Sequence, residues 1–215
     1  MLPTPSTEHV SFDTIYEPSE DSYLFLDTLS SVSESEWLSA RFNSTSTSTN
    51  TTAPLVVEVG TGSGVVLAFV AANSHEIFGR RDILTLGTDV NRYACLSTRT
   101  TVKTAIQERQ AAAALKSTHI ASVLGDLCSP LRPGSVDVLL FNPPYVPTEE
   151  LPRLPLVTEQ EAAAAAEPLS RSAKFERDSY YLSLTGWKAE SVGNSGTQAG
   201  WEKLVIVRIW RDDSQ

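Results

Sequence analysis

The sequence has little that would serve a metal site, a membrane span or a nucleic-acid surface. Its two cysteines, Cys95 and Cys128, form no CxxC pair and have no histidine nearby, so neither a zinc site nor a disulfide framework is indicated. No apolar stretch approaches the roughly 18 residues that a membrane-spanning helix needs. Asp and Glu outnumber Lys and Arg by 26 to 17, and the net charge of −9 argues against binding nucleic acid through its phosphates.

We expect no secretory signal, because the start of the sequence lacks a basic region followed by an apolar run. A reducing location, cytosolic or nuclear, is therefore expected. With 215 residues and 41% hydrophobic content, the chain suits one domain over residues 1–215. Within it we expect a loosely held arm (1–15), a flexible low-complexity loop (43–52) and an irregular insertion (146–172).

Strands and helices alternate along the rest of the chain. Helices are expected from near Pro18 to Leu29 and over 65–72 and 91–114; strands over 55–60, 84–89, 120–126, 136–142 and 202–211. The first helix should bury Tyr23, Leu26 and Leu29, and the third should bury Ala94, Val102, Ala105 and Ile106. In the last strand, residues 204–207 are apolar enough for burial on both faces. This pattern predicts an α/β fold, a doubly wound and mostly parallel sheet with a closing antiparallel strand.

A glycine-rich turn, Gly60-Thr-Gly62-Ser-Gly64, joins the first strand to the second helix. A strand, a glycine turn and a helix in succession are typical of a nucleotide-type binding unit, although a plain tight turn would need glycines too. Val65 occupies the sixth position of the GxGxxG pattern, which argues against NAD, and the absence of GKS or GKT excludes a phosphate-binding P-loop.

Acidic residues recur where the predicted strands end. Asp89 could accept hydrogen bonds from both ribose hydroxyls of a nucleoside, or it could cap the next helix. Asp126 could accept from an adenine amino group while Leu127 packs on the ring. A single loop aspartate would indicate little, but the series Glu58, Asp89 and Asp126 at successive strand ends favours a nucleoside site.

The fourth predicted strand stops at Phe141-Asn142-Pro143-Pro144-Tyr145. Neither proline can donate to a sheet ladder, and each restricts the residue before it, so Asn142 is predicted at the carboxyl end of a strand with its backbone fixed. Ligands of open α/β sheets bind at that edge. The amide of Asn142 can both donate and accept there, and we expect it to position a planar nitrogen for chemistry.

Together these motifs resemble the class I S-adenosylmethionine-dependent methyltransferases. The NPPY motif resembles that of the branch of this class that methylates planar nitrogens. Within it, Tyr16-Glu-Pro-Ser-Glu-Asp-Ser22, Phe141-Asn-Pro-Pro-Tyr-Val146 and the tail Gln198–Leu204 resemble the eukaryotic HemK-type protein glutamine methyltransferases. The resemblance covers roughly residues 14–148 and 186–211. It implies S-adenosylmethionine as cofactor and, as substrate, the glutamine of the GGQ motif in the class 1 translation termination factor.

The resemblance also implies roles for individual residues. Asn142 and the Pro143 carbonyl would accept the two hydrogens of the substrate amide, and Tyr145 would pack against it, with no metal required. The resemblance implies the following cofactor-binding residues: Ser22 at the methionine end, Glu58, Gly60 and Gly62 at the turn, Asp89 at the ribose, Asp126 and Leu127 at the adenine, and Asn142.

A partner is implied as well. Family members work as heterodimers with a small zinc-binding activator protein, and the strand at 120–124 would be the natural edge for strand addition, although it could equally be an ordinary edge strand. The chain departs from the family where Thr185 runs directly into Gly186, because one helix and one central strand of the family pattern are absent there. Two other hypotheses stay open: a DNA adenine-N6 or RNA guanine-N2 methyltransferase, and a catalytically impaired variant that binds cofactor or partner.

Overall fold

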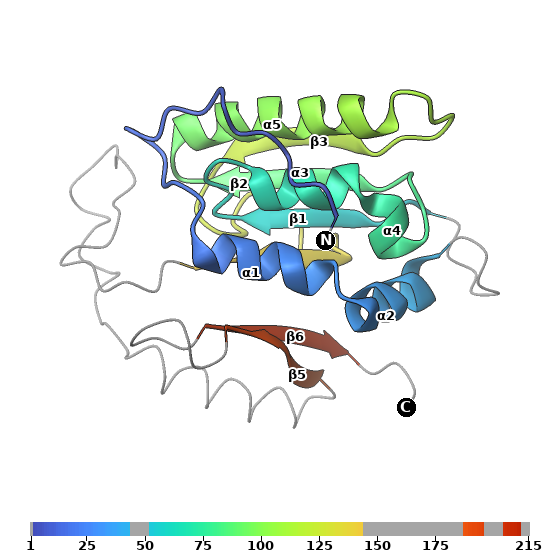
Figure 1. Ribbon diagram of the computed structural model, residues 1–215. Coiled ribbons are helices and arrows are strands. Elements are labelled where there is room, and N and C mark those ends of the chain that lie inside the picture. The colour runs from blue at the N-terminus through green and yellow to red at the C-terminus, as the bar shows by residue number, and fades with distance from the viewer. Residues whose placement is uncertain (1, 44–51, 144–186, 196–203, 212–215) are drawn as a thin grey trace, which may run out of the picture. The chain divides into compact units, whose positions relative to one another are not determined.

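The computed structural model describes residues 2–43, 52–143, 187–195 and 204–211 (Figure 1). The chain separates into two compact units, Met1–Val146 and Pro147–Gln215, and each is described by itself. The elements of the first unit are α1 (Glu20–Leu29), α2 (Val32–Phe42), β1 (Leu55–Val59), α3 (Val65–Ala72), α4 (Ser74–Phe78), β2 (Leu84–Asp89), α5 (Arg92–Gln110), β3 (Thr118–Leu124) and β4 (Val138–Phe141). The insertion at 146–172, most of the low-complexity loop and the junction at Thr185 lie outside the described residues.

The first unit is built on a four-stranded parallel sheet in the order β3-β2-β1-β4. The chain moves outward from β1 through β2 to β3 and then crosses back to place β4 on the other side of β1. This is the strand order of a doubly wound sheet. Successive strands are added in one direction from β1 to β3, and β4 is then added on the opposite side of β1. The predicted α/β fold with a parallel sheet is therefore confirmed, and β3 lies at one edge of the described sheet, as predicted.

Helices α3 and α5 pack together against the sheet, with α1 beside α3 (Figure 1). All eight residues of α3 are buried, as its uninterrupted apolar sequence predicts. Helix α5 buries its four predicted residues: Ala94, Val102, Ala105 and Ile106. In α1 the predicted face is partly wrong: Leu26 and Leu29 are buried, but Tyr23 is exposed and Phe25 takes its place. Phe25 and Leu29 lie four residues apart and so share a face of the helix.

The N-terminal arm, expected to be loosely held, packs against the helices. Val10 and Ile15 are buried. Nδ2 of Asn91 donates to the carbonyl of Thr14 at 2.7 Å, and the His9 ring lies 3.2 Å from Oγ1 of Thr101. Buried apolar side chains and long-range hydrogen bonds thus hold the arm, although its sequence shows no periodicity.

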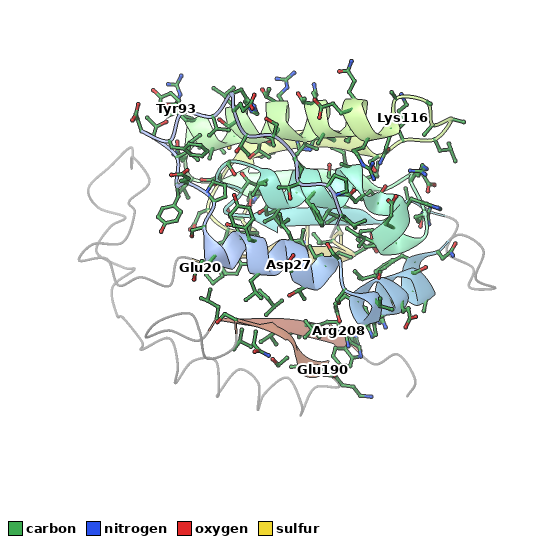
Figure 2. The ribbon with its side chains drawn as sticks, viewed as in Figure 1. Glu20, Asp27, Tyr93, Lys116, Glu190 and Arg208 are labelled. Carbon is green, nitrogen blue, oxygen red and sulfur yellow. The ribbon has the colours of Figure 1, made fainter. Side chains whose placement is uncertain are left out.

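The second unit contains an antiparallel pair of strands, β5 (Trp187–Asn194) and β6 (Val205–Arg211). Glu190 lies opposite Arg208, and their side chains form an ion pair at 2.7 Å (Figure 2). The predicted closing strand is present and antiparallel, but the expected burial of residues 204–207 is wrong, since each is half-buried or exposed. The ladder that the structure describes for β6 is with β5 alone, in a sheet of two strands.

Candidate cofactor and substrate site

Two parts of the predicted site, the glycine turn and Asn142, lie side by side where the strand order of the sheet reverses. Val59 of β1 and Phe141 of β4 are register partners in parallel strands. The next residues, Gly60 and Asn142, therefore leave the sheet side by side at its carboxyl edge. A doubly wound sheet binds its ligands in the crevice at this position.

Hydrogen bonds fix the glycine turn to the end of the neighbouring strand, β2. The backbone N–H of Gly60 donates to the carbonyl of Thr88 at 2.8 Å, and that of Gly62 donates to Oδ2 of Asp89 at 2.9 Å. Gly60, Gly62 and Gly64 have φ of 70°, 52° and 80°, in the left-handed region that residues with a side chain rarely adopt. The turn is therefore held in one shape by strand β2.

The glycines of the turn serve two different purposes. A Cβ placed on Gly60 or Gly62 would meet no atom within 4 Å, so the backbone there faces open space. A Cβ on Gly64 would lie 2.6 Å from Cα of Thr98, so this glycine permits close packing of α3 on α5. An open, bare backbone beside a strand-end carboxylate suits the close approach of a nucleoside cofactor, and the turn fits S-adenosylmethionine in this respect.

Asp89 connects the turn to the start of α5. Its Oδ2 accepts from Gly62 and its Oδ1 accepts from the N–H of Asn91 at 2.8 Å, while the side chain is 9% exposed. Helix α5 is capped by Asn91, whose side chain accepts from the N–H of Tyr93, so the alternative role of Asp89 as helix cap is wrong. Each carboxylate oxygen has two acceptor sites, which leaves capacity for ribose hydroxyls.

Glu58 supports the turn from inside the protein. Its side chain is buried, and Oε2 accepts from the N–H of Leu67 in the first turn of α3 at 3.0 Å. Burial raises the pKa of this carboxyl well above its usual range; the Leu67 N–H lowers the pKa, but the nearby Asp89 carboxylate raises it further. Glu58 thus lies beneath the turn as a buried carboxyl whose protonated form its surroundings favour.

The predicted adenine residues follow β3. Asp126 is exposed, and Leu127 has φ of 48°, the only positive φ that the described non-glycine residues adopt. Oγ1 of Thr88 donates to the carbonyl of Leu127 at 2.9 Å, which holds this backbone beside the end of β2. Backbone strain of this kind costs about 1–3 kcal/mol and is concentrated at binding sites.

Helix α1 contributes a residue that the sequence analysis did not select. Nδ2 of Asn142 donates to Oδ2 of Asp21 at 2.8 Å, across 121 positions of sequence. Ser22, the predicted cofactor contact, is the next residue on α1 and is half-buried. By sequence alone Asp21 is an acidic residue in the first turn of a helix, and the motif Glu20-Asp21-Ser22 is the signal that could identify it.

The Asp21 carboxylate has a second partner at the start of α1. Burial raises its pKa, but hydrogen bonds from Ser19 and then Asn142 lower it more, so the pKa lies below its usual value. Ser19 is the N-cap of α1, yet its hydroxyl makes no capping bond and donates to Oδ1 of Asp21 at 2.7 Å. Forgoing a serine cap costs about 1 kcal/mol.

The remaining site predictions are placed only in part. Pro143 is exposed next to Asn142, and Tyr145 lies outside the described residues. At the β3 edge, Ile120 and Leu124 are exposed at 52% and 55%.

Within the described ranges, no group of three or more His, Cys, Asp or Glu side chains could hold a metal ion. No helix in these ranges is long and apolar enough to cross a membrane.

Comparison with known proteins gives relatives of one kind. The chain is 35% identical over 158 residues to the mouse protein "Methyltransferase HEMK2", a match that covers 70% of this chain and 60% of the relative. It is 30% identical over 153 residues to the "eRF1 methyltransferase catalytic subunit mtq2" of Schizosaccharomyces pombe, covering 69% and 59%. The chain thus spans about 60% of the length of these relatives. No family model matches it.

A solved structure is also similar. It is the N-terminal domain of human METTL16 in complex with SAH, at a TM-score of 0.37 and 15% identity, covering 81% of this chain and 56% of that one.

Proposed function

Because the chain is related in sequence to the HEMK2/Mtq2-type methyltransferases, we propose that it transfers a methyl group from S-adenosylmethionine to the side-chain nitrogen of a protein glutamine. The substrate proposed is the glutamine of the GGQ motif in the class 1 translation termination factor, with the chain acting as catalytic subunit of a heterodimer. The fission yeast relative is named as the catalytic subunit of an eRF1 methyltransferase, which supports both the substrate and the heterodimer.

The observation that carries the proposal is the register of β1 and β4. Since Val59 pairs with Phe141, the glycine turn and Asn142 lie next to each other at the same edge of the sheet. A methyl donor bound over the turn would thus lie beside the amide that orients the acceptor nitrogen. Catalysis of this kind depends on positioning, which two adjacent, rigid strand ends supply.

Asn142 and Pro143 would hold the substrate glutamine. The amide nitrogen of glutamine is a poor nucleophile because its lone pair is delocalised. Two acceptors, Oδ1 of Asn142 and the carbonyl of Pro143, would fix the orientation of its N–H groups and stabilise the positive charge that the nitrogen gains. S-adenosylmethionine, when bound, supplies the methyl group as an electrophile. The surplus proton then passes from the methylated nitrogen to solvent.

The proposed partner subunit would bind at the edge strand β3. This strand has one ladder partner, β2, in the described sheet, and it presents the exposed apolar side chains of Ile120 and Leu124. An unpaired strand edge with apolar side chains suits strand addition by another protein. A small zinc-binding activator is the partner proposed.

Two measurements test the function. Calorimetry of S-adenosylmethionine binding, with and without the activator, tests the cofactor site; no binding in either case would refute the enzyme proposal. Transfer of radiolabelled methyl to recombinant termination factor, with DNA and RNA oligonucleotides as alternative acceptors, tests the substrate. Changing GGQ to GGA should abolish the labelling, and label that persists would show that the methyl group goes elsewhere.

A second candidate, a variant that binds cofactor but transfers methyl poorly, is favoured by one observation. In the described sheet β4 has β1 as its single neighbour, and Leu139 and Phe141 are 51% and 44% exposed. Asn142 would then stand on an edge strand with less support than a central strand provides. Cofactor binding of ordinary strength together with absent methyl transfer would establish this candidate.

A further inference from the structure

We propose that Asp21 is a positioning residue for the reaction, which holds the amide of Asn142 in the one orientation that turns its oxygen toward the substrate glutamine. The inference rests on the proposed function and extends it to a residue outside the NPPY motif. It comes from the contact between Nδ2 of Asn142 and Oδ2 of Asp21 at 2.8 Å.

An asparagine amide has two nearly isosteric orientations that exchange its oxygen and its nitrogen. An ionised carboxylate accepts hydrogen bonds and donates none, so it selects the orientation in which the NH2 group faces it. With Nδ2 directed to Asp21, Oδ1 takes the opposite branch of the planar amide. A hydrogen bond to a charged acceptor is about twice as strong as one to a neutral acceptor, so this orientation of the Asn142 amide is strongly preferred.

Asp21 is itself held in place. Its Oδ1 accepts from the Ser19 hydroxyl at 2.7 Å, so each carboxylate oxygen has its own partner. Asp21 also lies in the first turn of α1, where the partial positive charge of the helix N-terminus favours a carboxylate. Ser19 makes this contact in place of the usual N-cap hydrogen bond. Departures of this kind from local sequence preferences are found at functional sites.

The carboxylate also contributes to the charge of the site. The proposed acceptor nitrogen becomes positive as its bond to the methyl carbon forms and the bond between sulfur and methyl breaks, with the electron pair returning to sulfur. A negative charge behind Asn142 polarises that amide, since hydrogen bonds in series strengthen one another. Asp21 would act in this way through Asn142, without touching the substrate.

The test uses four variants of the full 215-residue chain: D21N, D27N, N142A and the double variant D21N/N142A. The D21N change keeps the shape of the side chain and removes the charge. Asp27, on the same helix and exposed, is the matched control (Figure 2). We expect D21N to lower kcat for the glutamine substrate by about 10- to 100-fold. The KM and the S-adenosylmethionine Kd should stay within about threefold, and D27N should leave all three constants unchanged.

The double variant separates positioning from a merely structural role. If Asp21 acts through Asn142, D21N should cause little further loss once N142A is present, because residues that act as one unit are not additive. Fully additive losses would overturn the inference, and so would an unchanged kcat in D21N.

A readout independent of activity keeps this inference distinct from the proposed function. In 15N-labelled protein, the side-chain NH2 signal of Asn142, identified by its loss in N142A, should shift in D21N and stay in place in D27N. If the unaltered chain transfers no methyl to glutamine, the proposed function fails. An Asn142 signal that does not respond to D21N would overturn the inference whatever the activity.

Discussion

The most specific prediction concerns the buried Glu58 and how its protonation makes stability depend on pH. Burial raises the pKa of this carboxyl well above its usual range, so the folded protein releases this proton at a higher pH than the unfolded chain, which releases it near pH 4.5. A raised folded-state pKa gives stability that is fully present below the unfolded pKa and is lost as pH rises toward the folded pKa. Glu58 therefore makes the fold less stable at neutral pH than at pH 4.5, other groups being equal.

Changing Glu58 to Gln should remove this dependence. Glutamine has the shape of the protonated acid, and its Oε1 can still accept the N–H of Leu67 that Oε2 now accepts at 3.0 Å. Between the two pKa values, the unfolding free energy of the unaltered chain should fall by about 1.4 kcal/mol per pH unit relative to E58Q. The stability of E58Q relative to the unaltered chain should thus increase as pH rises.

The assay is urea unfolding of the full chain at pH 5, 6, 7 and 8, with E108Q as control because Glu108 is exposed on α5. The difference in unfolding free energy between E58Q and the unaltered chain should widen with pH, while E108Q should run parallel to the unaltered chain. Parallel curves for E58Q would refute the reasoning, since they would show that Glu58 is ionised in the folded protein. If E58Q is less stable than the unaltered chain at pH 5 and the difference still changes with pH as expected, the second oxygen accepts a bond that an amide cannot replace.

Three further changes test the glycine turn and the buried Arg80. Gly64→Ala should lower the unfolding free energy by about 3 kcal/mol in urea unfolding, because φ is 80° and the new Cβ would lie 2.6 Å from Cα of Thr98. Gly62→Ala should cost only about 1 kcal/mol, since no atom lies within 4 Å. Calorimetry should nevertheless show S-adenosylmethionine binding about tenfold weaker, because the methyl group enters the proposed cofactor space. Arg80→Leu should lower the melting temperature and cost about 3 kcal/mol, because buried Arg80 donates to both oxygens of Asp82 and to the carbonyls of Phe42 and Thr52.

Local sequence was sufficient for the elements whose boundaries depend on local chemistry. Helix α3 and strand β2 have the predicted bounds, because a glycine turn precedes α3 and an acid ends β2. Helix α5 was predicted to reach residue 114 but ends at Gln110. There Nε2 of Gln110 donates to the carbonyls of Ala71 and Ala72, and its Oε1 accepts from the N–H of Ser117. These partners lie on other segments, so no local pattern could locate the end of the helix.

The candidate site shows the same division between local and long-range information. The strand ends that carry Gly60, Asp89 and Asn142 follow from runs of apolar residues interrupted by glycine, acid or proline, and the family resemblance is supported by the relatives found. The partner of Asn142 could not be found in this way. Asp21 is 121 positions away, and an acid in the first turn of a helix has a sufficient local explanation.

The same distinction gives a prediction for two acids that sequence alone treats alike. Asp89 and Asp126 are both predicted at strand ends and as nucleoside-binding residues. Asp89, at the end of β2, accepts hydrogen bonds from the backbone N–H groups of Gly62 and Asn91, whereas Asp126, two residues beyond β3, is exposed. Asparagine at position 89 has one acceptor oxygen, and its NH2 would face a backbone N–H. D89N should therefore lower the unfolding free energy of the cofactor-free chain by about 1–3 kcal/mol.

D126N should leave that free energy unchanged within about 0.5 kcal/mol and should weaken only S-adenosylmethionine binding, measured by calorimetry. Equal stability of D89N and D126N in urea would contradict this assignment and would make Asp89 a ligand-binding residue alone. Loss of stability confined to D89N would show that the glycine turn is shaped by the carboxylate before any cofactor binds. The site would then be preorganised, because the same oxygens that remain available to ribose already hold the backbone that the cofactor must approach.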